Sequence, residues 1–302
     1  MLKRTIYIGN PFTLRLRFNQ LEFFDELKNT NKAPVEDIGI LILDHPQVCV
    51  THGIVNALLE NGVAILWCDS RHLPNGLLLP LENHHIHTAI LRHQMDSSEP
   101  LRKQIWKQIV QSKIANQAAI LDWSQADSVP LRVLIAEVQS GDAGNHEGRA
   151  AALYWKLLFQ DKGPFQRYRY GPSPNHLLNY GYAVLRAVVA RSLVGSGLHP
   201  ALGLHHHNKY NPYCLADDIM EPFRPAVDKL VLSIIEDYGN DLPDELTKEI
   251  KQSLLTIPVL DVIIGKELSP LMNAAQRMTA SLVQCYNGET RKLLCPEMVL
   301  GS

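Results

Sequence analysis

The sequence predicts an α+β protein in which an N-terminal β-sandwich is followed by a larger, all-helical C-terminal domain. Two observations lead to this prediction. Short apolar segments separated by turn residues fill the first third of the chain, and further on the apolar residues recur with a helical instead of a strand period. A chain of 302 residues is also long enough for two domains with buried cores.

The strands expected in the first domain are short. Residues 4–8 are followed by a glycine and proline turn, and residues 14–18 alternate apolar with basic side chains. Residues 38–43 form a continuous apolar run, which is typical of a strand buried on both faces. Further strands are expected at residues 48–51 and 63–67, and a helix at residues 54–61.

The domain boundaries follow from the change of period. We place the sandwich domain at residues 1–76, a linker with proline and several histidines at residues 77–88, and the helical domain at residues 89–302. The expected helices lie at residues 104–114, 150–159, 177–194, 227–238 and 246–255.

Composition and charge exclude several classes of protein. No apolar run is long enough to span a membrane, and the N-terminus lacks the apolar core of an export signal, so we expect a cytoplasmic protein. The five cysteines form no Cys-x-x-Cys pair, which argues against a disulfide scaffold and a structural zinc site. The net charge is −2, but residues 146–230 carry ten Lys and Arg against six Asp and Glu, so a basic surface for nucleic acid is compatible with the sequence.

The densest group of polar side chains lies between residues 203 and 221. Carboxylates favour Mg²⁺ or Mn²⁺, and an imidazole among them shifts the preference toward Mn²⁺ or a softer ion. The acids have helical spacing and would share one face, whereas adjacent histidines cannot all face one ion. The alternative is a solvent-exposed acidic turn at the start of a helix. The group comprises His205, His206, His207, Asp217, Asp218 and Glu221.

Glu147 lies at the start of an expected helix, beside a glycine and a run of alanines. A carboxylate at this position can act only as a favourable charge near the helix N-terminus. Alternatively, because its small neighbours allow another helix to approach closely, Glu147 can join the downstream histidine and acids as a third ligand.

Residues 167–170 alternate arginine with tyrosine. Side chains of these two kinds suit phosphate groups and the faces of nucleic-acid bases. The alternative is an exposed loop whose tyrosines pack inward, without a role in binding.

Several segments, in this order, carry a resemblance to a known family. They are Glu147-Gly148-Arg149-Ala150-Ala151, Leu178-Asn179-Tyr180-Gly181-Tyr182-Ala183, Gly197-Leu198-His199-Pro200, Gly203-Leu204-His205-His206 and Asp218-Ile219-Met220-Glu221-Pro222-Phe223-Arg224-Pro225. Their combination resembles the CRISPR adaptation integrases and endonucleases, the proteins numbered one in the Cas series. Two segments, Asn211-Pro212-Tyr213 and Met220-Glu221-Pro222-Phe223-Arg224-Pro225, are similar to those of members from type II loci. The resemblance extends from about residue 5 to the mid-230s.

The resemblance implies a catalytic metal site made of a glutamate, a histidine and a second acidic residue, which binds Mg²⁺ or Mn²⁺. Glu147 matches the first position and Glu221 the third. His206 is the preferred match for the second position, with His205 as the alternative. Asp218 is either a further ligand or a residue that orients a ligand.

The resemblance also implies an activity and partners. Family members insert a short DNA fragment into a repeat array by attack of a 3′-hydroxyl on a phosphodiester, and they assemble with a small ferredoxin-like protein. We therefore expect double-stranded DNA as the substrate and a homodimer that forms through the N-terminal domain, with residues 38–43 at an exposed sheet edge. The arginines expected to bind DNA are Arg149, Arg167, Arg169 and Arg224.

Two other functions are compatible with the same residues. One is a non-catalytic DNA-binding subunit of the same assembly, in which the metal site is silent or structural. The other is a metal-dependent hydrolase of small molecules, which would need a concave apolar pocket and would show no salt-dependent affinity for DNA.

Overall fold

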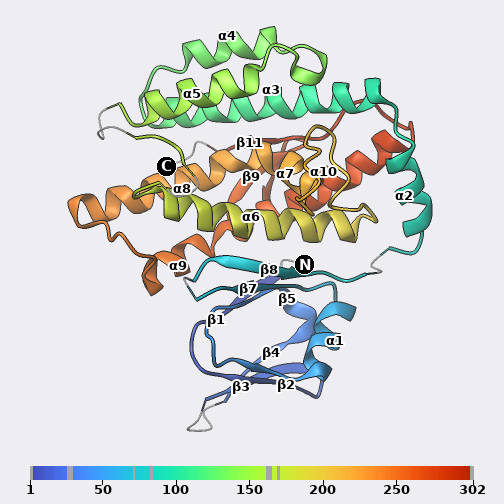
Figure 1. Cartoon of the computed structure of the whole chain (residues 1–302), viewed down its shortest axis with the longest axis vertical. Helices are drawn as coiled ribbons and strands as arrows, with labels where there is room; N and C mark the ends of the chain where they lie inside the picture. Colours follow the sequence, from blue (N-terminus) through green and yellow to red (C-terminus); the bar gives the residue numbers. More distant parts are fainter. Residues whose placement is uncertain are drawn as a thin grey trace.

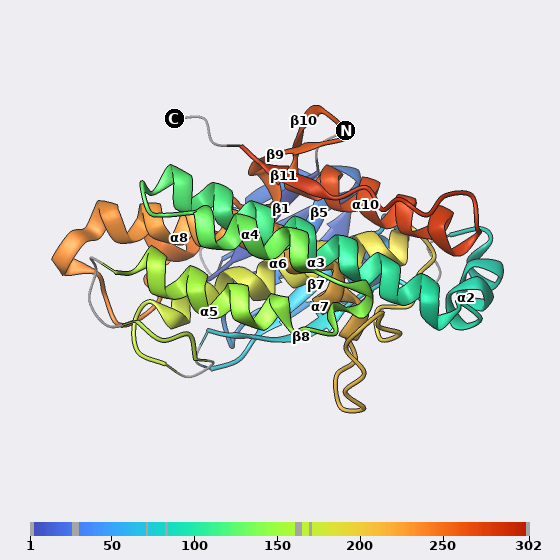
Figure 2. The same ribbon diagram turned by 90° about the horizontal axis from the view of Figure 1, so that it is seen from above.

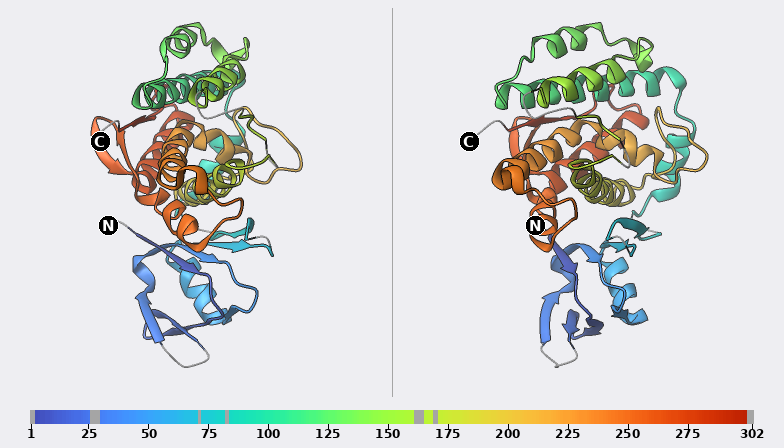
Figure 3. Two further views of the ribbon diagram at one scale, coloured as in Figure 1. Left: turned by 90° about the vertical axis from the view of Figure 1, so that its left-hand side faces the viewer. Right: turned by 60° about the vertical axis from the view of Figure 1, so that its left-hand side comes forward.

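A computed structural model describes residues 3–25, 30–70, 72–81, 84–160, 165–168 and 171–299, apart from the side chain at position 240. The strands of the first part gather at one end of the molecule and most helices lie at the other end (Figures 1 and 3). The strands of the first part are β1 (Arg4–Ile8), β2 (Thr13–Arg17), β3 (Gln20–Phe24), β4 (Thr30–Pro34), β5 (Ile38–Leu43), β6 (Cys49–Val50), β7 (Ala64–Cys68) and β8 (Pro74–Leu78).

These strands form two four-stranded sheets, in the orders β1-β5-β7-β8 and β4-β3-β2-β6. In the first sheet, β1, β5 and β7 are parallel and β8 is antiparallel to β7. Helix α1 (His52–Glu60) buries Ile54 and Leu58 in a small core that both sheets share. Since β5 and β7 lie inside the first sheet, its edge strands are β1 and β8.

Strand β5 explains why residues 38–43 are apolar throughout. Its side chains alternate between two cores: Leu41 and Leu43 belong to the small core, whereas Ile40 and Ile42 belong to the large core that contains the helices. Because β5 pairs with β1 on one side and β7 on the other, the expectation of an exposed dimer edge at these residues is wrong. All six residues are buried.

The second part of the chain is built around the long helices α3 and α6, with α6 between the first sheet and α3 (Figures 1 and 2). Gly181 allows α8 to approach α6, because a Cβ atom there would lie 2.6 Å from Val227. The helices are α2 (His87–Met95), α3 (Glu99–Trp123), α4 (Val129–Glu137), α5 (His146–Leu158), α6 (Asn175–Gly195), α7 (Cys214–Met220), α8 (Arg224–Tyr238), α9 (Lys248–Leu254) and α10 (Leu271–Tyr286).

The mixed α+β class is confirmed, but the expectation of an all-helical second part is wrong. A three-stranded sheet with the order β10-β9-β11 lies among the helices; its strands are β9 (Asp261–Ile264), β10 (Glu267–Pro270) and β11 (Pro296–Met298). A two-residue turn joins β9 to β10, with φ of 58° at Gly265 and 71° at Lys266. Positive φ at both positions is the geometry of a hairpin turn that matches strand twist.

Asp44 links the first sheet to the helical part. It follows β5 and pairs through Oδ2 with Nζ of Lys251 on α9 at 2.8 Å, while Oη of Tyr7 donates to the same oxygen at 2.6 Å. His72 Nδ1 lies 2.8 Å from Oδ1. Both side chains of the Asp44–Lys251 pair are almost completely buried.

We expect Lys251→Met to lower the free energy of unfolding by about 3 kcal/mol, because it leaves the Asp44 carboxylate buried without its cation. Chemical denaturation monitored by circular dichroism measures the change. Lys248→Met is the matched control, since Lys248 lies on the same helix and is exposed. A loss no larger than that of the control would show that this ion pair does not hold the two parts together.

Candidate metal centre

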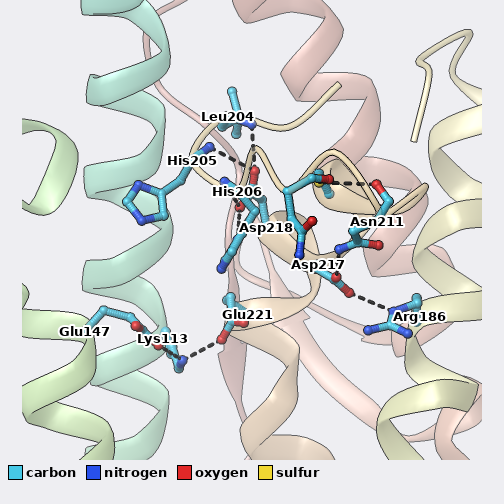
Figure 4. A network of polar contacts seen from close by, with 12 residues as sticks. Lys113, Glu147, Arg186, Leu204, His205, His206, Asn211, Asp217, Asp218 and Glu221 are labelled. Atoms are coloured by element: carbon cyan, nitrogen blue, oxygen red, sulfur yellow. Dashed lines mark hydrogen bonds and ion pairs between the residues drawn. The ribbon is translucent and has the colours of Figure 1, made fainter. Parts of the chain in front are cut away.

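Four segments that are distant in the sequence meet at the candidate site (Figure 4). Helix α3 packs against α5 on one side and against the short 3₁₀ helix η3 (Glu221–Phe223), which continues α7, on another. The loop at 203–207 lies beside α7. Pro222 and Pro225 occupy the first turns of η3 and α8, where a missing backbone N–H has no cost.

The acids of α7 and η3 do not form the solvent-exposed turn that was the alternative interpretation. Asp217, Asp218 and Glu221 are all buried. Buried carboxylates require charged or hydrogen-bonding partners, and each of the three has them. Asp217 pairs with Arg186 at 2.7 Å and accepts a hydrogen bond from Asn211 at 2.7 Å.

Asp218 organises the histidine loop. Its side chain is 0% exposed. The carboxylate accepts hydrogen bonds from the backbone N–H groups of Leu204 at 2.6 Å, His205 at 3.0 Å and His206 at 3.3 Å. The ring nitrogen Nδ1 of His206 lies 2.5 Å from Asp218 Oδ1. Gly203 is required in this turn, because a Cβ atom there would collide with the carbonyl oxygen of His206.

This arrangement fixes the orientation of His206. The hydrogen bond to Asp218 raises the pKa of His206 above its ordinary value, although burial acts in the opposite direction. Because Nδ1 faces Asp218, Nε2 is the ring nitrogen that remains for a ligand. The ring lies on the side of the loop that faces Glu221 (Figure 4).

His205 lies differently. Its imidazole stacks on Trp106 of α3, with ring centroids 4.4 Å apart and an interplanar angle of 2°. Burial lowers the pKa of His205, and the neighbouring His206 lowers it further. The third histidine, His207, is exposed.

Glu147 and Glu221 are brought together by a lysine. The ammonium of Lys113 on α3 pairs with Glu147 Oε1 and lies 2.5 Å from Glu221 Oε2, and Arg224 Nε lies 2.9 Å from Glu221 Oε1. The exposed fractions of the side chains are 8% for Lys113, 6% for Glu221 and 30% for Glu147. Carboxylates and cations thus alternate from Glu147 to Arg224.

These contacts determine the direction in which the pKa values of Lys113 and Glu221 are shifted. Burial lowers the pKa of Lys113, but Glu221 and Glu147 outweigh it and raise that pKa above its ordinary value. Burial raises the pKa of Glu221, but Arg224 and Lys113 outweigh it and lower that pKa. Both groups are therefore charged at neutral pH.

The residue types at this centre are ones that a divalent cation accepts, but their spacing is not that of a closed ion site. Glu221 Oε2 is buried and accepts no hydrogen bond of acceptable geometry from the described part of the chain, although the Lys113 ammonium is close. Carboxylate oxygens with one imidazole nitrogen are ligands that Mn²⁺ and Mg²⁺ accept. Nevertheless, within the ranges that the structure describes, no three His, Cys, Asp or Glu side chains lie close enough to hold an ion. The Lys113 ammonium lies between the two glutamates instead (Figure 4).

The arginines predicted to bind DNA differ in their surroundings. Arg149 is exposed and lies 3.9 Å from Glu137. Arg167 donates to Asn175 and Asn179, while Arg169 lies outside the described residues. Arg224 and Arg167 both stack over the ring of Tyr182, at 4.6 Å and 5.3 Å from its centroid.

A groove of about 880 Å³ begins beside this centre. Arg167, Arg186 and Arg224 contribute to its lining, together with the exposed Tyr210 and the ring of Tyr182. Tyr168 is half exposed, so the alternative in which the tyrosines of residues 167–170 pack inward does not hold for that residue. Tyr170 lies outside the described residues.

Beneath the groove, Asp228 accepts hydrogen bonds from Tyr182 at 2.5 Å and Tyr154 at 3.0 Å. Burial raises the pKa of Asp228 to about 6, although both hydroxyl groups favour the ionised form. These contacts fix the Tyr182 ring on which the two arginines lie.

Sequence reasoning missed Lys113, Trp106 and Arg186. Lys113 gave a usable signal, since it occupies an inward-facing position on α3 with the buried Ile109, Val110 and Ile114 as neighbours on that face. A lysine at such a position needs a buried anionic partner. The local sequence does not mark Arg186 or Trp106 as a residue of the site.

Comparisons with known proteins identify the family of this chain. The family model described as "CRISPR associated protein Cas1" matches residues 6–257. A protein of Neisseria meningitidis serogroup C (strain 8013), named "CRISPR-associated endonuclease Cas1", is 40% identical over 302 residues, which cover 99% of this chain and 97% of that protein.

Solved structures show the same fold. The structure titled "Casposase bound to integration product" superposes with a TM-score of 0.79 at 20% identity, covering 97% of this chain and 92% of that one. A "Cas6-RT-Cas1--Cas2 complex" matches with a TM-score of 0.74 at 19% identity, covering 96% of this chain and 35% of that one. From the family model and the Neisseria relative together, this chain belongs to the Cas1 family of CRISPR associated proteins.

Proposed function

We propose that this protein is a metal-dependent DNA endonuclease and integrase of CRISPR adaptation. It inserts short DNA fragments into the repeat array by attack of a 3′-hydroxyl on a phosphodiester, and it hydrolyses DNA when water attacks instead. The observation that carries this proposal is the buried Glu221 next to Glu147, beside a histidine that Asp218 orients. The endonuclease name of the Neisseria relative and the integration product in the casposase structure support it.

Glu147, His206 and Glu221 are the proposed ligands of one Mg²⁺ or Mn²⁺ ion. When bound, such an ion neutralises charge on phosphoryl oxygens and aligns the nucleophile with the leaving group. The contacts of Asp218 with three backbone amides and with His206 support an orienting role for this residue. The stacking of His205 on Trp106 makes His206 the better candidate for the imidazole ligand.

The DNA backbone is proposed to lie along the arginine-lined groove. Arg167, Arg186 and Arg224 line the groove and are held in place by Asn179, Asp217 and Glu221 respectively. Fixed guanidinium groups bind phosphates at little further entropic cost. Arg149 is exposed near the start of α5 and adds a further cation on the Glu147 side, and Arg169 is retained as a DNA-binding candidate.

Assembly is part of the proposal. An integrase must place two hydroxyl ends at two target strands, so we propose a homodimer joined by a small ferredoxin-like partner. The solved Cas6-RT-Cas1--Cas2 complex supports a partner of the Cas2 kind. Residues 1–76 would serve assembly, residues 77–88 would link the two domains, and residues 89–302 would bind DNA and metal.

The 40% identity to the Neisseria relative supports a type II-like member, and a cytoplasmic location is proposed with it. No helix in the described ranges is long and apolar enough to cross a membrane.

The test uses Glu147→Gln with the Cas2 partner, a labelled double-stranded fragment and a plasmid that carries the repeat array. We expect strand transfer to fall by about three orders of magnitude, because a proposed metal ligand is lost. Binding of the fragment is expected to remain within about twofold, since the proposed phosphate contacts are untouched.

Two controls make this result specific. Glu137→Gln changes an exposed carboxylate close to the start of α5 and is expected to integrate normally. A fragment that ends in a 3′-dideoxynucleotide should not be joined by any variant. If the wild-type protein binds DNA but transfers no strand with either metal, the non-catalytic assembly subunit is the better interpretation.

A further inference from the structure

Lys113 lies where the proposed metal centre is most acidic, and this inference rests on that proposed function. Its ammonium pairs with Glu147 Oε1 and Glu221 Oε2, which come from different segments of the chain. Only 8% of the Lys113 side chain is exposed. A lysine on a buried helix face would otherwise cost several kcal/mol of desolvation, so this position needs both carboxylates.

The charges of the group balance without any metal. Glu147 and Glu221 each carry one negative charge, and Lys113 and Arg224 each carry one positive charge, so the sum is zero. A divalent ion between the same two carboxylates would add two positive charges next to an ammonium. At such short separations in a buried site, repulsion between the ion and the ammonium is strong.

We propose that Lys113 is a resident counter-cation, which neutralises Glu147 and Glu221 in the metal-free protein and competes with the divalent ion for these two carboxylates. Metal binding then requires the Lys113 ammonium to leave the glutamates. The protein keeps a stable, buried acidic pair before loading, and its affinity for the metal is lower than the ligands alone would give.

A purely structural role for Lys113 makes the opposite prediction. If the ammonium only holds the two glutamates in position for the ion, removing it lets them separate and weakens metal binding. The direction of the change in metal affinity therefore separates the two roles.

The test is Mn²⁺ binding to the full-length protein without DNA, followed by the electron paramagnetic resonance signal of free Mn²⁺. We expect Lys113→Met to bind Mn²⁺ about tenfold more tightly than the wild type, because methionine keeps the aliphatic length and removes the charge. In the metal-free state the same variant should melt at a lower temperature, and Mn²⁺ should raise its melting temperature by more than that of the wild type. Lys103→Met, on the same helix in an exposed pair with Glu99, should change neither property.

A second pair of variants covers the case in which Lys113→Met does not fold. Lys113→Met combined with Glu147→Gln removes one charge of each sign, and its affinity is compared with that of Glu147→Gln alone. The proposal requires the double variant to bind Mn²⁺ more tightly than the single one. Equal or weaker binding in both comparisons overturns it.

Failure of the proposed function would look different. If the wild-type protein binds no Mn²⁺, or if its binding is unaffected by Glu221→Gln, the metal centre itself is wrong and this inference falls with it. Alternatively, the wild-type protein binds Mn²⁺ and Glu221→Gln does not, but removing Lys113 fails to strengthen Mn²⁺ binding. In that case the metal centre stands and only the role of Lys113 is refuted.

Discussion

Glu221→Gln is expected to lower strand transfer by about three orders of magnitude and to destabilise the metal-free protein as well. The second effect follows from the contacts of the carboxylate, which lies 2.5 Å from Lys113 Nζ and 2.9 Å from Arg224 Nε. Only 6% of the Glu221 side chain is exposed. Without its charge, two cations face each other in a buried site, and we expect a loss of about 3 to 5 kcal/mol in the free energy of unfolding.

Three measurements on the same preparation separate these effects. Denaturant unfolding in the presence of a chelator gives the stability change, a salt titration gives DNA affinity, and the array assay gives strand transfer. Metal-free DNA affinity should hold or rise slightly, because a negative charge near the proposed phosphate path is removed. Glu99→Gln, which breaks the exposed pair with Lys103, is the control and should cost less than about 1 kcal/mol.

Each outcome that contradicts this prediction has a clear meaning. Normal integration by Glu221→Gln would refute its role as a ligand and make Asp218 the candidate. An unchanged free energy of unfolding would show that the alternating charges around Glu221 contribute nothing to stability. Loss of DNA affinity equal to the loss of strand transfer would indicate a structural position instead of a catalytic one.

The spacing of apolar residues predicted those strands and helices in which several successive residues follow one pattern. The continuous apolar run at residues 38–43 predicted a strand buried on both faces, and β5 is buried on both faces between two cores. Periodicity could not show that β5 lies in the middle of its sheet, because strand order depends on pairing with distant segments. The β9–β11 sheet was missed because its strands have only three or four residues, although Gly265 marked the turn.

The candidate site could be predicted only in part from the sequence, because it too depends on contacts between segments that are distant in the chain. The residue types of Glu147, His206 and Glu221 could be matched by motif, but three adjacent histidines are equivalent in sequence. What distinguishes His206 is the position of its Nδ1 against Asp218, which results from the turn at Gly203. Lys113 lies 34 positions before its partner Glu147. The sequence could therefore indicate that this lysine needs an acidic partner, but not which residue that partner is.

The role of Asp218 is the other point at which a large effect is expected. Asparagine has nearly the same size, but it offers one acceptor oxygen and replaces the other with an N–H₂ donor. In Asp218→Asn, that donor would face amide N–H groups or Nδ1 of His206, all of which now point at the carboxylate. The loop at 203–207 would lose its anchor, and His206 would lose the contact that sets its orientation.

We therefore expect Asp218→Asn to weaken Mn²⁺ binding by about 10- to 100-fold, as is usual when the partner of a metal-binding histidine is lost, and to lower strand transfer with it. Asp217→Asn is a closely matched control, because it makes the same change one residue away in a carboxylate that contacts Arg186 and Asn211 instead of the histidine loop. Equal Mn²⁺ affinities in the two variants would refute the orienting role. Complete loss of binding in Asp218→Asn, as large as the loss expected for Glu221→Gln, would identify Asp218 as a ligand in its own right, because a residue that only orients His206 leaves the two glutamates able to hold the ion weakly.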